Sequence, residues 1–253
     1  MKVYNDINAW LSMRKELSTH LSLGVVMTMG ALHEGHLSLM RQSKQENDRT
    51  LVTIFVNPTQ FDNKNDLQKY PKTWESDCDL LQQVEIDYLL APRVSHIYPA
   101  HDYFYMNENH FSQQLCGLSR PNHFQGVLTI VLKLLNLAQA QRAYFGEKDY
   151  QQAKLIQKMT QCFFLPTQII LHPTIRDPDG LALSSRNTRL SETGREKATF
   201  FARLLKTEKS VLNMKHQLEL EGIQVDYLEE IGQHRFGAVW IEDIRLIDNC
   251  AKP

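Results

Sequence analysis

Apolar and amphipathic segments alternate along the first two thirds of this chain. Short apolar segments rich in β-branched residues predict buried strands at 23–29, 50–56, 86–91, 142–145 and 167–172. Apolar residues at helical spacing predict helices over about 35–48, 73–83, 124–141 and 150–162, with Thr73 and Ser76 as candidate cap residues. This order predicts an α/β fold with a doubly wound parallel sheet, in which ligands gather at the carboxyl ends of the strands.

The pattern changes after Pro173. A turn-rich loop at 176–180 precedes a charged amphipathic helix at 192–208, and strands are expected at 224–228 and 238–247. We therefore predict two domains: residues 1–173, and a smaller α+β domain over residues 174–253. Residues 103–106 are a candidate edge strand that is read equally well as core.

Composition narrows the class of protein. A net charge of −1 over 253 residues argues against a general nucleic-acid or acidic membrane surface, since such surfaces need clustered cations. The four cysteines are far apart without a C-x-x-C pair, which favours a reducing cytoplasm over a disulfide framework or a zinc ribbon. No long apolar segment opens the chain, and the apolar stretch 126–140 is interrupted by Lys133, so we expect a soluble protein without a membrane span.

The first strand breaks at Gly30 and leads into two histidines, His33 and His36, before a helix. Small residues let the backbone approach a ligand, and helix N-termini favour anions. Two imidazoles on one helix face could donate to the same phosphate and become cationic near neutral pH. The alternatives are surface or capping histidines on an ordinary turn, or a shared metal ion that lacks nearby ligands to complete a zinc site.

Two further clusters follow predicted strands. Asn57-Pro-Thr-Gln-Phe61 places the amides of Asn57 and Gln60 on a turn, where they could bind a small polar molecule or satisfy the backbone. Gly146-Glu-Lys-Asp-Tyr-Gln-Gln152 places Lys148 at a strand end, with Asp149 set to cap the next helix and Gln152 near its start. A solvated Lys-Asp pair is the alternative at the second cluster.

The loop Leu183-Ser-Ser-Arg-Asn187 could wrap a triphosphate with two hydroxyls and a forked guanidinium, or could be a helix cap or surface loop. Taken separately, each cluster has a structural explanation. Their coincidence with an α/β order favours a nucleotide site.

Six motifs together resemble the pantothenate synthetase family. They cover most of residues 23–190: Thr28-Met-Gly-Ala-Leu-His-Glu-Gly-His36, Phe55-Val-Asn-Pro-Thr-Gln-Phe61, Tyr70-Pro-Lys-Thr73, His123-Phe-Gln-Gly-Val-Leu-Thr129, Phe145-Gly-Glu-Lys-Asp-Tyr-Gln-Gln152 and Asp179-Gly-Leu-Ala-Leu-Ser-Ser-Arg-Asn187. The resemblance implies a Rossmann-like, cytoplasmic, homodimeric ligase. It would join pantoate to β-alanine with ATP and Mg²⁺ through a pantoyl adenylate.

The resemblance also implies roles for individual residues. His36 is the proton donor, acting with His33, Lys148 and Arg186 as the catalytic set. Asn57, Gln60 and Gln152 bind pantoate, Gln60 also contacts β-alanine, and Asp77 matches a position associated with Mg²⁺. ATP would contact Met29, Gly30, Ala31, Leu32, His33, Glu34, Gly35, His36, Gly146, Glu147, Lys148, Asp149, Ile175, Leu183, Ser184, Ser185 and Arg186.

Three departures from the family pattern bear on local contacts. Met27 replaces a usual proline, Asn122 a glycine, and Cys116 a glutamate whose carboxylate could orient an arginine such as Arg120. Two other functions stay open from the sequence: a different nucleotidyltransferase, and a non-catalytic ATP-binding sensor.

Overall fold

The computed structural model describes the chain except residues 18–19, 62–63 and 101–103. Within the described residues, a parallel sheet has the strand order β1-β4-β3-β2-β5-β6. Its strands are β1 (Lys2–Tyr4), β2 (Leu23–Thr28), β3 (Arg49–Ile54), β4 (Tyr88–Leu90), β5 (Arg142–Gly146) and β6 (Gln168–His172). The predicted α/β fold with a doubly wound parallel sheet is confirmed.

Helices and single turns connect these strands. The longer helices are α1 (Ile7–Glu16), α2 (Glu34–Glu46), α4 (Trp74–Gln83), α7 (His123–Ala138) and α8 (Tyr150–Cys162). The short ones are η1 (Pro58–Gln60), α3 (Lys64–Lys69), α5 (Val94–Ile97), η2 (Phe111–Gln113), α6 (Cys116–Ser119) and η3 (Glu147–Asp149).

Alternate side chains of the central strands enter two separate cores. Val25 of β2 and Leu51 of β3 pack in a cluster with α7 and α8. Their neighbours Val26 and Val52 pack against α2 and α4. Burial on both faces explains why the strands are continuous apolar segments in the sequence.

Strands β2 and β5 meet at the centre of the sheet, where the chain order reverses. From β2 the chain continues outward to β3 and β4, whereas β5 continues to β6 on the other side. In doubly wound sheets, ligands bind in the crevice at this reversal, outside the carboxyl ends of the strands. The loops after Thr28 and Gly146 therefore begin at the expected binding position.

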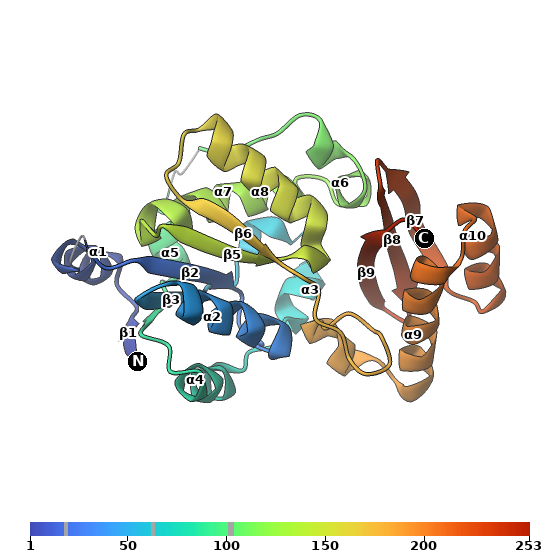
Figure 1. The fold of residues 1–253 in the computed structure, drawn as a ribbon, viewed down its shortest axis with the longest axis horizontal. Coiled ribbons are helices and arrows are strands. Elements are labelled where there is room, and N and C mark those ends of the chain that lie inside the picture. Colours follow the sequence, from blue (N-terminus) through green and yellow to red (C-terminus); the bar gives the residue numbers. More distant parts are fainter. Residues whose placement is uncertain (18–19, 62–63, 101–103) are drawn as a thin grey trace.

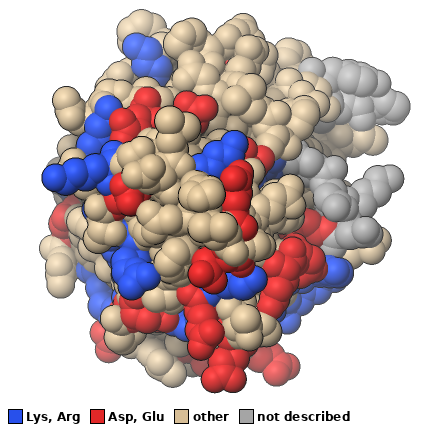
Figure 2. All heavy atoms as spheres, turned by 90° about the vertical axis from the view of Figure 1, so that its right-hand side faces the viewer, with Lys and Arg blue, Asp and Glu red and all other residues tan. Residues whose placement is uncertain are grey.

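The part of the chain after β6 has its own core. A loop containing η4 (Ser185–Arg189) leads to helices α9 (Glu192–Thr207) and α10 (Val211–Leu220) and the antiparallel strands β7 (Gln224–Ile231), β8 (His234–Ile241) and β9 (Ile244–Ala251). Helix α9 buries Phe201 and Leu205 against this sheet. Figure 1 shows this C-terminal part beside the parallel sheet, and Figure 2 shows basic and acidic side chains intermixed on its outer face.

Several predicted elements differ from the structure. The segment 238–247 is not one strand, because it contains the turn between β8 and β9. Residues 104–106 form no strand, and Tyr103 lies outside the described residues. The sequence pattern also did not indicate β1, α1 or α10. Across the described residues, no helix is both long and apolar enough to cross a membrane.

Candidate active site

The rings of the two histidines accept backbone hydrogen bonds at the start of α2. His33 is the N-cap, where its Nδ1 accepts a hydrogen bond from the backbone N–H of Gly35 at 3.2 Å, and His36 Nδ1 accepts from the N–H of His33 at 3.3 Å. His33 thus precedes the helix instead of sharing its face, yet the ring centroids are only 4.1 Å apart. Because Nδ1 is an acceptor in both rings, each neutral imidazole carries its proton on Nε2.

Both imidazoles are held neutral in this structure. Burial, with a contribution from Lys148, lowers the pKa of His33 to about 4. Burial and the neighbouring His33 lower the pKa of His36 to about 3. These lowered pKa values favour neutral rings that act as Nε2–H donors, where the sequence also allowed for cationic ones.

The small residues of this loop make room for side chains. Gly30 has φ +80°, and a Cβ there would lie 2.9 Å from Asp77 Oδ2. A Cβ on Gly35 would meet the His33 ring at 2.9 Å. Gly146 has open space around it and lines the cavity described below, so it is the glycine of the site that leaves room for a ligand.

Asp77 is a buried residue of α4, not a solvated one. Its Oδ2 accepts from Ala31 N at 3.0 Å and from the Thr73 hydroxyl at 3.1 Å, and its Oδ1 accepts from Leu32 N at 2.8 Å. Thr73 stands at the N-cap of α4 but uses its hydroxyl for this contact instead of a cap bond, and Ser76 lies inside the helix. Because both carboxylate oxygens accept N–H groups of the loop after β2, Asp77 holds that loop in place. It also lies outside the two cavities described below, an arrangement that does not fit a direct metal ligand.

Gln60 is oriented by a buried asparagine. Asn57 Nδ2 donates to Gln60 Oε1 at 3.0 Å, while Asn57 Oδ1 accepts from the Tyr98 hydroxyl at 2.8 Å. Gln60 Nε2 then contacts Met29 Sδ at 3.1 Å, a weak acceptor that a substrate oxygen can replace. Turn η1 approaches α7 closely, since a Cβ on Gly126 would lie 2.4 Å from the carbonyl oxygen of Thr59.

Lys148 enters the site from η3, directly after β5. Its Nζ lies 3.7 Å from Asp149 Oδ2. Asp149 occupies the N-cap position of α8 without a side-chain cap bond, so the predicted capping role is wrong. Gln152, in the first turn of α8, lines the same cavity.

The loop containing the two serines docks onto the parallel-sheet part. Arg186 Nη2 lies 3.1 Å from Asp66 Oδ2 of α3, and Ser185 lines the same cavity as the buried Tyr70. Ser184 caps η4 by accepting from Arg186 N at 3.3 Å. The loop is therefore already folded over the end of the sheet in this structure.

Most predicted site residues converge on one cavity of about 270 Å³. Its lining includes Met29, His33, Gly35, His36, Asn57, Gln60, Gly146, Lys148, Asp149, Gln152, Ile175, Leu183, Ser184, Ser185 and Arg186. A second cavity of about 530 Å³ shares Arg120, Lys148, Asp149, Ser184 and Arg186 and extends along the C-terminal part. The predicted residues outside both cavities are Gly30, Ala31, Leu32, Glu34, Asp77 and Glu147, and Glu34 instead pairs with exposed Arg41.

Arg120 and His123 both support Gln60, a link that the sequence pattern did not predict. The backbone carbonyl of Gln60 lies 2.9 Å from His123 Nδ1 and accepts from Arg120 Nη2 at 3.1 Å. Burial and the adjacent Arg120 lower the pKa of His123 to about 3. The Arg-Pro-Asn-His sequence at 120–123 carried this signal, and Asn122 has φ +63°, which explains why the family's usual glycine tolerates asparagine there.

Cys116, which stands where the family usually has a glutamate, contacts Tyr227 and Arg245. Its Sγ lies 3.1 Å from the Tyr227 hydroxyl and 3.6 Å from Arg245 Nη2. Arg245 Nη2 forms an ion pair with the carboxylate of Asp226 at 2.7 Å, so the charge of Arg245 is balanced without the family's glutamate.

The fold and site define a doubly wound α/β protein whose cavity lies at the reversal of strand order, beside a second sheet unit. A model of the family described as pantoate-β-alanine ligase matches residues 2–251. The pantothenate synthetase of Legionella pneumophila (strain Lens) is 47% identical over 98% of this chain and 99% of its own. The pantoate-β-alanine ligase of Francisella tularensis, solved with β,γ-ATP and β-alanine, aligns with a TM-score of 0.96 at 40% identity, covering 100% of this chain and 98% of its own. The pantothenate synthetase of Thermus thermophilus aligns at 0.90 with 34% identity, over 99% of each chain.

The chain belongs to the pantoate-β-alanine ligase family. It is an enzyme of pantothenate biosynthesis, and the alternative of a different nucleotidyltransferase is not favoured.

Proposed function

We propose that this chain condenses pantoate with β-alanine at the expense of ATP, through an enzyme-bound pantoyl adenylate, and that the residues lining the 270 Å³ cavity carry out both steps. One observation carries the proposal. His33 and His36, the amide of Gln60, Lys148 and the Ser-Ser-Arg loop come from distant parts of the chain and line the same cavity.

In the first step, a carboxylate oxygen of pantoate attacks the α-phosphorus of ATP. The bond from that phosphorus to the bridging oxygen breaks, and the electron pair leaves with pyrophosphate. Negative charge grows on the phosphate oxygens, where preorganised donors and cations are most effective. The Nε2–H groups of His33 and His36, Lys148 and Arg186 supply them, with Ser184 and Ser185 closing over the phosphates. His36, the proposed proton donor, would donate its Nε2–H to these oxygens while its Nδ1 keeps the bond from the backbone of His33.

Pantoate binds on the amide side of the cavity. Asn57 donates to the side-chain oxygen Oε1 of Gln60, so the side-chain NH₂ group of Gln60 is left to face the ligand. Gln152 offers a second side-chain amide. Asn57 itself uses both ends of its amide within the protein, so it acts on pantoate through Gln60.

In the second step, the amine of β-alanine attacks the acyl carbon of pantoyl adenylate. The carbon–oxygen bond to AMP breaks, its electron pair leaves with AMP, and the attacking neutral amine releases a proton to solvent as the amide forms. Orientation alone can contribute about 7–11 kcal/mol to such a step. Gln60, which lines the cavity, is the residue that we assign to both pantoate and β-alanine.

Mg²⁺ enters this proposal with the triphosphate. Among the residues that the structure describes, no group of three or more His, Cys, Asp or Glu could hold a metal. Such a hard divalent ion would be held mainly by the triphosphate and by water. When bound, it would neutralise phosphate charge.

Assembly and location complete the proposal. We propose a homodimer, supported by the exposed rings of Phe104 and Tyr105, and a cytoplasmic location, supported by four free cysteines. Sedimentation velocity of the purified chain tests the dimer, and a monomer at micromolar concentration would contradict it.

Pyrophosphate release tests the reaction. We expect release from ATP when pantoate alone is added, limited to about one equivalent per site, and continuous turnover when β-alanine follows. A chain that binds ATP but releases no pyrophosphate with pantoate would instead be a non-catalytic sensor.

A further inference from the structure

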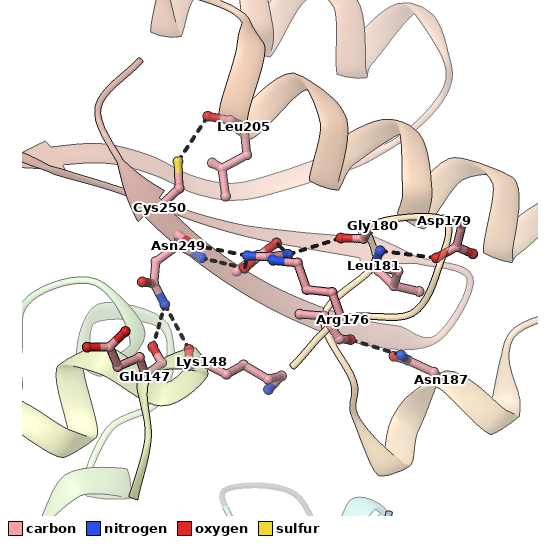
Figure 3. A network of polar contacts seen from close by, with 12 residues as sticks. Glu147, Lys148, Arg176, Asp179, Gly180, Leu181, Asn187, Leu205, Asn249 and Cys250 are labelled. Carbon is pink, nitrogen blue, oxygen red and sulfur yellow. Dashed lines mark hydrogen bonds and ion pairs between the residues drawn. The ribbon is translucent and has the colours of Figure 1, made fainter. Parts of the chain in front are cut away.

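Asn249 of β9 crosses from the C-terminal part to the turn that carries Lys148. Its Nδ2 donates to the backbone carbonyls of Glu147 and Lys148, each at 2.9 Å. Figure 3 shows the amide pointing at both carbonyls. The residue is 8% exposed, so these bonds are shielded from water.

The two carbonyls belong to the peptide groups on either side of the Lys148 Cα. Fixing both peptide planes fixes φ and ψ of Lys148, and with them the direction in which its side chain leaves the backbone. An amide nitrogen has two hydrogens and can therefore serve two carbonyls at once, which a hydroxyl or a carboxylate cannot do.

The residue before Asn249 anchors the opposite side of the site. The carboxylate of Asp248 accepts two hydrogen bonds from the Arg176 guanidinium, at 2.6 and 2.8 Å, and a third from the backbone N–H of Asn249 at 2.8 Å. Arg176 donates to the carbonyl of Gly180 at 3.1 Å, at the base of the Ser-Ser-Arg loop. One dipeptide of β9 thus connects the turn of Lys148 to the loop of Arg186.

We propose that Asn249 is a positioning residue for adenylation, which sets the direction of Lys148 from across the boundary between the two parts of the molecule. The inference rests on the proposed role of Lys148 toward the triphosphate. Because pyrophosphate has left before the amine attacks, Asn249 matters in the first step and not in the second.

The test compares Asn249→Asp, which keeps the shape but loses both donors, with the wild type in each half-reaction. A misplacement of about 1 Å can cost about 10²-fold in rate. We expect pyrophosphate release with ATP and pantoate to fall by about that factor, while condensation of supplied pantoyl adenylate with β-alanine stays within about threefold. Asn249→Ser keeps one donor, so its rate of pyrophosphate release should lie between those of the wild type and Asn249→Asp. This variant replaces Asn249→Asp in the test if circular dichroism shows that Asn249→Asp does not fold.

The neighbouring Cys250 provides a matched control. Its Sγ donates to the Leu205 carbonyl at 3.3 Å, entirely within the C-terminal part, and Cys250→Ser should keep wild-type rates in both steps. Loss of the first step in this control, or equal losses in both steps for Asn249→Asp, would overturn the inference by revealing a general effect on folding.

A double variant separates this inference from the proposed function. If Asn249 acts through Lys148, then Lys148→Ala with Asn249→Asp is no slower than Lys148→Ala alone. Multiplying losses would overturn the inference. A wild-type rate in Lys148→Ala would overturn the proposed role of Lys148 itself, whereas a slow Lys148→Ala beside a wild-type Asn249→Asp would overturn only the role of Asn249.

Discussion

Each active-site histidine serves the fold and the chemistry with different atoms. The Nδ1 atoms of His33 and His36 accept backbone N–H groups at the start of α2, which leaves the Nε2–H groups for the ligand. Capping and the phosphate binding that we propose use different atoms of each ring, so these two roles, which are alternatives in the sequence, are compatible. The cap also selects the tautomer that the phosphate needs, because a protonated Nδ1 could not accept these bonds.

His36→Ala should slow pyrophosphate release by about 10²–10³-fold, the usual loss for one donor to developing charge. It also removes half of the capping box, so we expect a loss of about 1 kcal/mol in the free energy of unfolding. Single-turnover kinetics and urea unfolding measure the two effects separately. The exposed His96→Ala of α5 is the control, and an unchanged turnover in His36→Ala would remove His36 from the mechanism.

Stability should rise with pH between about 4 and 6.5. The folded-state pKa values of His33 and His123 lie at about 4 and 3, below the usual 6.5, so the unfolded chain binds more protons in this range. For His123, buried beside Arg120, the slope is at most about 1.4 kcal/mol per pH unit. Urea unfolding of His123→Gln should show a flatter dependence than the wild type, and an identical slope would contradict the prediction.

At the scale of elements, the sequence predicted the central strands and their helices well because period and burial agree there. Helix α8 was predicted with its observed bounds, and β2 and β3 within two residues. The β8–β9 hairpin was missed because its turn lacks the expected glycine or asparagine, and Glu242 adopts φ +58° instead. Strand β1 was missed because it is short and mostly exposed.

The residues of the cavity were predictable where they form motifs at strand ends. Asn249 and Asp248 were not, because a single polar residue in a strand gives no sign of a partner about a hundred residues away. The position of Asp77 was noted, but its burial against the loop after β2 depends on how α4 packs, which no local pattern reports.

Asp77→Asn should weaken ATP use without changing the requirement for Mg²⁺. The asparagine amide has only one oxygen, so it can accept from the N–H of either Ala31 or Leu32. Its NH₂ group would then face the other N–H, and the loss of that hydrogen bond costs about 1–3 kcal/mol. We expect the KM for ATP to rise by about tenfold or more, while the Mg²⁺ concentration for half-maximal rate stays constant at saturating ATP. A rise confined to the Mg²⁺ requirement would instead make Asp77 a metal ligand.

At the scale of the whole molecule, the site is divided between two units that fold around separate cores. The histidines and amides come from the parallel-sheet part, and Arg186 comes from the segment that leads into the C-terminal part. Contacts across the division therefore decide how far the phosphate donors are preassembled. In this structure the Arg186 guanidinium forms an ion pair with Asp66, and this carboxylate would compete with the triphosphate that we assign to Arg186.

Asp66→Asn should consequently improve ATP binding. The Arg186–Asp66 pair is partly exposed, and such pairs contribute about 0.2–1 kcal/mol, so releasing the arginine should lower the KM for ATP by at most about fivefold. Asp243→Asn is the matched control, since Asp243 pairs with Arg189 and Lys69 and leaves Arg186 untouched. If Asp66→Asn raises the KM for ATP while Asp243→Asn does not, the carboxylate instead helps to hold the loop in its binding position, and the pair is part of the assembled site.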